Sequence, residues 1–213
     1  MRPASLVLLW IAALAACTTE PDYHAVPLAV SWLEWPAEVR TAVPFGVRLA
    51  GYIPCGTRLV PSSRSDTIAV SFEPYALVPN AGPPCIPIVP TMFDDTVVVP
   101  GLAAASARLY QIRVAMLPDS SGVRPYGTVG EITVQPETVT VNQVSAVGFA
   151  EIARDPSGCL RVHPITRLFA TSYVLENPPD TTSSWSAAVR GYLYDAAAPL
   201  CGETRVFHLV SRN

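Results

Sequence analysis

The sequence predicts an all-β protein made of two consecutive β units, and three observations favour this fold class. Twenty-two prolines are spread along the chain, which is hard to reconcile with long helices because proline lacks the amide donor that a helix interior needs. Short segments alternate apolar and polar residues, the period of a half-buried strand, and turn residues separate them. Half of the residues are hydrophobic and only 15% are charged, so the chain can bury a substantial core.

The N-terminal stretch has the pattern of an export signal. Met1-Arg2 gives a short positive start, and an unbroken apolar run follows from residue 6 to residue 16. This run is too short for the roughly 20 residues of a membrane-spanning helix, but it has the size and order of a signal-peptide core. The motif Leu14-Ala15-Ala16-Cys17 resembles the bacterial lipobox, in which the cysteine is acylated and becomes the first residue of the mature chain. An ordinary secretory signal with a coincidental cysteine is the alternative.

The resemblance implies a location and a first partner. Residues 1–16 would be a lipoprotein signal peptide, Cys17 the lipidation site and residues 17–24 a lipid-anchored tether. Two or more acyl chains hold a protein stably on a membrane. By the same resemblance, Thr18 in place of aspartate after the cysteine favours the outer membrane of the bacterial cell envelope.

Four further cysteines remain once Cys17 is set aside, an even number in a chain that is expected to be exported. Four cysteines allow three pairings. We expect Cys55–Cys85 and Cys159–Cys201, because each pair then lies within one of the two units. None of them shows the close C-x-x-C spacing of a zinc or redox site.

The first unit is expected to cover residues 25–136. Six segments alternate or carry β-branched residues and end at proline, glycine or a turn cluster, which predicts an antiparallel sandwich; they are 28–33, 45–50, 68–73, 96–99, 110–116 and 127–134. Leu102 followed by Tyr110 resembles the tyrosine corner of immunoglobulin-like domains, which implies an Ig-like β-sandwich. Cys55 and Cys85 follow strand ends, so the core disulfide of antibody domains is absent.

A linker is expected at 137–145, where Thr, Val, Asn and Gln dominate, and the second unit at 146–213. Its five predicted strands match the strand count of a small OB-type barrel; they are 147–152, 159–163, 172–176, 187–194 and 203–210. The order of four short pieces resembles small bacterial OB-like modules: Gly158-Cys159, Tyr173-Val174-Leu175, Val189-Arg190-Gly191 and Cys201-Gly202. Gly148 and Gly191 stand where a small barrel must bend its strands.

Several functions are disfavoured. Lysine is absent and the fourteen basic residues are scattered arginines with a net charge of −3, which argues against nucleic acid as a partner. No phosphate-binding loop, dinucleotide turn, calcium loop or G-x-S-x-G elbow occurs, so we expect neither cofactor nor catalytic residue. A metal site from His163, His208 and Glu151 lacks supporting spacing, and we expect strand histidines that are satisfied by hydrogen bonds instead.

Three regions are candidate binding surfaces. Trp32 and Trp35 would form an aromatic platform, although their spacing in a strand puts them on opposite faces and one is expected in the core. The proline-dense loop around Pro84 is a second candidate. Arg161, Arg190 and Tyr192 would mark the ligand face of the barrel. We therefore expect a non-enzymatic interaction or scaffold lipoprotein that contacts an envelope protein or glycan; a carbohydrate- or peptide-binding protein is the alternative, and a hydrolase is a weaker one.

Overall fold

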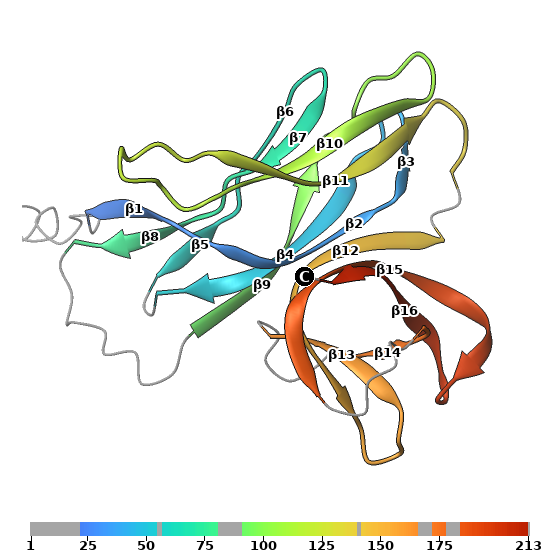
Figure 1. The fold of residues 1–213 in the computed structure, drawn as a ribbon. Coiled ribbons are helices and arrows are strands. Elements are labelled where there is room, and N and C mark those ends of the chain that lie inside the picture. Colours follow the sequence, from blue (N-terminus) through green and yellow to red (C-terminus); the bar gives the residue numbers. More distant parts are fainter. Residues whose placement is uncertain are drawn as a thin grey trace, which may run out of the picture.

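A computed structural model describes residues 22–54, 57–80, 91–139, 142–165, 172–177 and 184–212, and all regular secondary structure in these segments is β (Figure 1). The strands are β1 Tyr23–Pro27, β2 Val30–Pro36, β3 Glu38–Arg40, β4 Phe45–Ile53, β5 Arg58–Val60, β6 Ser63–Ser65, β7 Ala69–Phe72, β8 Tyr75–Pro79, β9 Thr91–Val99, β10 Arg108–Ala115, β11 Tyr126–Gln135, β12 Gln143–Arg154, β13 Leu160–Pro164, β14 Tyr173–Leu175, β15 Trp185–Leu200 and β16 Glu203–Arg212. The prediction of an all-β protein is confirmed. In the described segments, no helix is long and apolar enough to cross a membrane.

The C-terminal strands form a closed five-stranded barrel, as the sequence predicted. They pair in the order β13-β14-β16-β15-β12, and β12 also pairs with β13, which closes the ring. All neighbours are antiparallel except β14 and β16, which are parallel. Closure leaves these strands without a free edge. The barrel core is apolar and includes Ile152, Val162 and Phe207.

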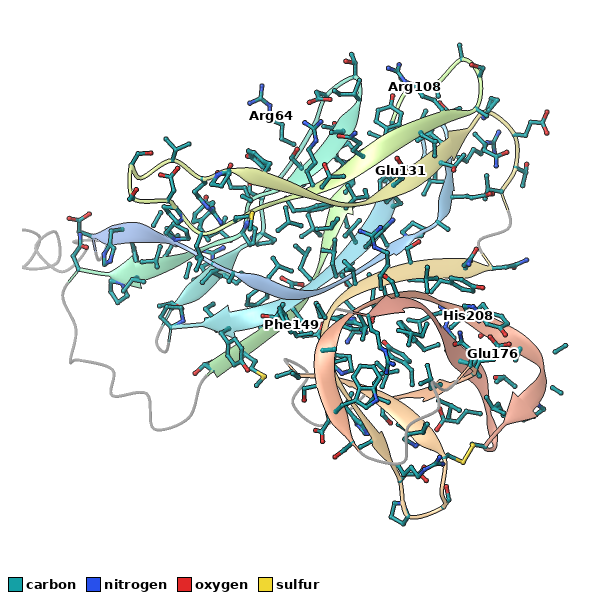
Figure 2. The ribbon with its side chains drawn as sticks, in the orientation of Figure 1. Arg64, Arg108, Glu131, Phe149, Glu176 and His208 are labelled. Atoms are coloured by element: carbon teal, nitrogen blue, oxygen red, sulfur yellow. A yellow bond between two sulfur atoms is a disulfide. The ribbon has the colours of Figure 1, made fainter. Side chains whose placement is uncertain are left out.

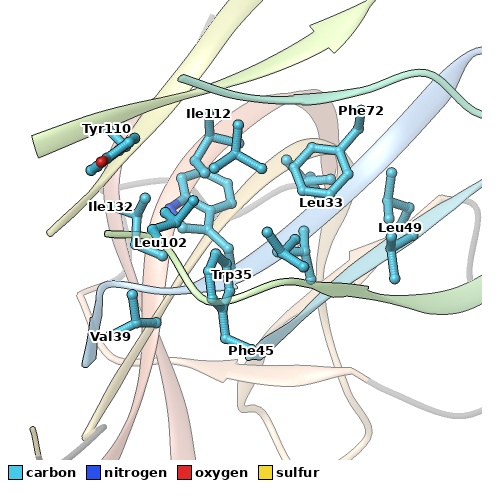
Figure 3. Packing of buried hydrophobic residues seen from close by; sticks show 14 of the residues in the cluster. Leu33, Trp35, Val39, Phe45, Leu49, Phe72, Leu102, Tyr110, Ile112 and Ile132 are labelled. Atoms are coloured by element: carbon cyan, nitrogen blue, oxygen red, sulfur yellow. The ribbon is translucent and has the colours of Figure 1, made fainter. Parts of the chain in front are cut away.

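The N-terminal strands form two sheets that share one core (Figure 3). One sheet has the order β3-β11-β10-β7-β6, and the other is the β2-β4-β9 part of a longer sheet. Alternate residues of each strand point inward, for example Phe45, Val47 and Leu49 on β4. A small third sheet, β1-β8-β5, lies beside them.

The tyrosine corner is present, but an immunoglobulin-like order is not confirmed. The hydroxyl of Tyr110 donates a hydrogen bond to the carbonyl of Ala103 at 2.8 Å, seven residues upstream. However, β7 runs parallel to β10 and β3 runs parallel to β11, so the sandwich is not purely antiparallel. In the turn between β6 and β7, the carboxylate of Asp66 accepts hydrogen bonds from the amides of Ile68 and Ala69, and β7 pairs antiparallel with β6 on its other edge.

Strand β2 belongs to both units. It pairs with β4 of the sandwich and with β12 of the barrel, so one eight-stranded sheet runs through both. Its side chains alternate between two cores: Trp32 packs in the barrel, whereas Leu33 and Trp35 pack in the sandwich. The predicted aromatic platform is therefore wrong, because Trp32 is fully buried and Trp35 is only 3% exposed.

The unit boundaries also differ from the predicted ones. Tyr23 and His24, placed in the tether, belong to β1, and the imidazole Nδ1 of His24 lies 2.6 Å from Oδ1 of Asn80 at the end of β8. Residues 143–145, placed in the linker, begin β12, and Val144 and Ser145 pair with β2. The sequence also gave no signal for β1, β3, β5, β6 and β8, which are five residues long or shorter.

Candidate functional site

The predicted disulfide of the barrel is present. Cys159 and Cys201 are bonded, with their Cα atoms 6.3 Å apart, and they tie the start of β13 to the turn before β16. Cys17, Cys55, Cys85 and Pro84 lie outside the described residues.

Arg161 has a structural role beside this disulfide. Its guanidinium lies 2.6 Å from a carboxylate oxygen of Asp155 and 2.6 Å from one of Glu203. Asp155 also accepts hydrogen bonds from the amides of Ser157 and Cys159, and these contacts, the one from Arg161 above all, hold the pKa of Asp155 well below its usual range. Because its charge is neutralised on both sides, Arg161 is a poor ligand contact.

The structure does not bring Arg161 together with the other two predicted barrel residues. Arg161 lies opposite Ala153 of β12, whereas Arg190 lies opposite Val147, six residues further along the same strand. At 3.2–3.4 Å per residue, the two arginines are separated by about 20 Å along β12. Arg190 instead donates a hydrogen bond to the carbonyl of Val129 in the sandwich at 2.8 Å.

Tyr192 lies in a polar cluster on the outer face of the barrel. We define the barrel cluster as Tyr192 and Tyr194 of β15, His208 of β16, and Glu176, which directly follows β14. The rings of Tyr192 and His208 are stacked, with centroids 4.8 Å apart and planes 16° apart. The Nδ1 of His208 lies 2.6 Å from Oε2 of Glu176, and the hydroxyl of Tyr194 donates to Oε1 of the same carboxylate. Figure 2 shows Glu176 and His208 together on this face.

Pairing of the neighbouring backbone fixes the position of Glu176. Its amide donates to the carbonyl of Phe207 at 3.0 Å. The side-chain amide of the next residue, Asn177, donates to the carbonyl of Leu209 and accepts from its amide, so it continues the ladder beyond β14. The carboxylate is thus held on the same face as His208, although part of it remains exposed to solvent.

The hydrogen bonds of the barrel cluster set the charge of its carboxylate and of one phenol. The hydrogen bonds from Tyr194 and then His208 lower the pKa of Glu176, so this carboxyl group is ionised at neutral pH. The Glu176 carboxylate raises the pKa of Tyr194 to about 12, so its phenol stays protonated. The face therefore offers an anionic acceptor beside two phenols and an imidazole, which suits hydrogen-bonded recognition.

The histidines do not form the metal site that the sequence analysis considered. His163 lies directly opposite Glu151 on β12, whereas His208 pairs with Glu176 on the other side of the barrel. Within the segments that the structure describes, no three His, Cys, Asp or Glu side chains converge to hold a metal ion.

A second polar network is buried where the barrel meets the sandwich. Glu34 of β2 is only 7% exposed, and its Oε1 accepts from the indole of Trp32 at 2.8 Å and from the hydroxyl of Tyr173 at 2.7 Å. Burial raises the pKa of Tyr173, and the charge of Glu34 raises it further. On the adjacent strand, Arg48 forms two hydrogen bonds to Asp94 at 2.6 and 2.7 Å, and these two side chains are 39% and 33% exposed. This network joins the units, because Tyr173 belongs to the barrel and Glu34 lies on the shared strand.

Sequence reasoning missed Glu176 and Tyr194. The alternation in β15 shows that Tyr192 and Tyr194 share a face, but their meeting with Glu176 and His208 depends on the register of β15, β16 and β14. Comparison of the chain with known protein families, with curated proteins and with solved structures found no match.

Proposed function

We propose that this chain is a lipid-anchored protein of the bacterial cell envelope and that it acts as a non-enzymatic interaction module. The motif at Leu14–Cys17 supports the anchor. The Cys159–Cys201 disulfide supports an exported protein, because such bonds persist in oxidising compartments and are rare in the cytosol.

The double pairing of β2 carries the interaction role. One strand contributes Trp32 to the barrel core and Trp35 to the sandwich core, and the buried network of Glu34 reinforces the connection. A unit joined in this way is held at a fixed orientation to the N-terminal strand β1, which follows the anchor. The barrel cluster is then a surface presented rigidly to a partner, and rigidity lowers the entropy lost on binding.

The chemistry of the barrel cluster supports a role without catalysis. Acyl transfer by a carboxylate–histidine pair needs a nucleophilic hydroxyl or thiol within hydrogen-bond reach of the imidazole. Among the described residues, the polar partner of His208 is Glu176. The other close neighbour of the imidazole is the Tyr192 ring, which is stacked on it.

Site-specific photocrosslinking in the envelope tests the proposal. A photoreactive phenylalanine analogue at Tyr192 should give one discrete adduct, and Glu176→Gln should weaken it. The matched control is the same analogue at Tyr52 of β4, a tyrosine of the sandwich that is 40% exposed. Equal adducts from both positions, or none from Tyr192 in an acylated protein, would contradict the interaction role.

A glycan- or peptide-binding protein is the second candidate. The observation that favours it is the stacked Tyr192–His208 pair beside an ionised carboxylate, since sugars and peptides are recognised by aromatic surface and polar groups together. Titration of the purified protein with envelope glycan fragments and peptides distinguishes the candidates. If a glycan or peptide binds and Tyr192→Ala abolishes that binding, the ligand of the barrel cluster is a glycan or peptide. The proposal of a protein partner would then be abandoned.

A further inference from the structure

An exposed apolar loop joins β10 to β11. We call residues 116–126 the hairpin tip. Four large apolar side chains in it are between 45% and 60% exposed: Met116, Leu117, Val123 and Tyr126. Single exposed apolar residues are ordinary, but several on one protruding loop indicate an interaction site.

The basic residue of the hairpin tip, Arg124, is directed toward the protein and forms hydrogen bonds there. The guanidinium of Arg124 donates to the carbonyls of Met116, Ala115 and Leu28, lies 3.8 Å from a carboxylate oxygen of Glu73, and the side chain is only 12% exposed. The apolar side chains are therefore displayed without a free cation among them.

The turn itself is stabilised by Asp119. Its carboxylate accepts hydrogen bonds from the amide and hydroxyl of Ser121 and from the amide of Val123, at 2.5 to 3.2 Å. These bonds lower the pKa of Asp119, so it is charged at neutral pH. A charged residue at the turn is compatible with the interfacial layer of a bilayer and not with the hydrocarbon centre.

The hairpin tip lies at the end of the molecule where the chain enters the fold. The bond from Arg124 to the carbonyl of Leu28 ties the hairpin to the end of β1. Figure 1 shows that the N-terminal end of β1, which begins at Tyr23, and the β10–β11 hairpin both lie at the left of the molecule. Tyr23, the first residue of β1, is also exposed.

Chain length relates this end to the membrane. Six residue steps separate Cys17 from Tyr23, and an extended chain spans at most about 3.6 Å per residue, so the start of β1 lies within about 20 Å of an acylated Cys17. We propose that the hairpin tip inserts Met116, Leu117 and Val123 into the interfacial layer of the bilayer that holds the lipid anchor. This inference rests on the lipidation of Cys17 proposed above. Contact at two points would orient the protein, since the lipid alone leaves it free to rotate.

Depth-dependent fluorescence quenching tests the insertion. The acylated mature chain carrying Leu117→Trp is reconstituted into phosphatidylcholine–phosphatidylethanolamine vesicles with or without brominated acyl chains. Interfacial segments lie about 5–10 Å into the headgroup–acyl boundary, so we expect the emission added by Leu117→Trp to fall by at least about twofold with brominated lipid. The matched control is Leu109→Trp, a leucine of similar exposure on β10 that lies opposite Thr133, eight residues from the tip position. Its emission should not change.

The controls distinguish a failure of the membrane-insertion proposal from a failure of the lipoprotein proposal. Acylation is verified by intact mass and folding by circular dichroism before quenching is measured. Unquenched Leu117→Trp in an acylated, folded protein would overturn the insertion and leave the lipoprotein proposal intact. A chain without acylation would overturn the lipoprotein proposal first. Shielding of Leu117→Trp from acrylamide in native envelopes but not in lipid vesicles would show a protein partner at the tip and would also overturn the insertion.

Discussion

Glu34 is expected to control the stability of the junction between sandwich and barrel. Glu34→Ala removes the acceptor for the indole N–H of Trp32 and the hydroxyl of Tyr173, both of which lie among buried residues. A buried donor left unpaired costs about 1–3 kcal/mol, so loss of the acceptor of the Trp32 indole should lower the free energy of unfolding by about 1–3 kcal/mol. Glu34→Gln keeps an amide oxygen at the same place and should recover most of that loss.

Urea denaturation followed by tryptophan fluorescence measures the difference. With an m-value of about 2 kcal/mol per molar urea, a loss of 3 kcal/mol would move the midpoint by about 1.5 M. Glu131→Ala is the matched control. Glu131 is an exposed residue of β11 that accepts the Trp35 indole hydrogen bond through its backbone carbonyl, not its side chain, so this substitution should change the midpoint little. If Glu34→Ala and Glu34→Gln unfold within about 0.5 kcal/mol of each other, Glu34 does not act as the acceptor that joins the units.

Other parts of the fold lead to further predictions. Gly148→Ala should destabilise the junction severely, because a Cβ at this position would lie 2.2 Å from a backbone carbonyl of β2 and the residue has a φ of +156°. Gly158→Ala is the control: its Cβ would have open space, so it should show only the milder cost of a positive φ. Thermal unfolding of the two variants measures the difference. Replacing both Cys159 and Cys201 by serine opens a loop of 42 residues and should cost up to about 4 kcal/mol in urea unfolding under oxidising conditions, and an unchanged midpoint would contradict the closure of this loop. Hydrogen bonds from Tyr194 and His208 lower the pKa of Glu176, so the ionised carboxylate stabilises the folded state. This stabilisation is present above the ordinary carboxyl pKa of about 4.3 and is lost as the pH falls below it. Glu176→Gln should therefore flatten the acid limb of a pH–stability curve, and an identical limb would argue against these bonds.

The sequence predicted the elements whose signals are local. The alternation of Phe45, Val47 and Leu49 identified β4, and prolines such as Pro36 and Pro164 marked strand ends. Tyr110 identified the corner with Ala103. The pairing of Cys159 with Cys201 followed from their position in one unit.

Features that depend on how distant strands meet were not predictable in the same way. Strand β2 is buried on both faces by two different cores, so Trp32 and Trp35 carry no alternating pattern that distinguishes core from surface. The parallel pairing of β7 with β10 joins strands that are distant in the sequence, and no local pattern predicts it. The barrel cluster requires the register of three strands, and no local pattern contains that information.

Mass spectrometry of the protein extracted from membranes without reducing agent tests the proposed identity most directly. We expect an N-terminal peptide that begins at Cys17 and carries acyl chains, together with a linked peptide pair that contains Cys159 and Cys201. An unmodified Cys17, or a chain that keeps residues 1–16 in the mature protein, would contradict the lipid anchor. Free thiols at Cys159 and Cys201 would contradict an exported fold.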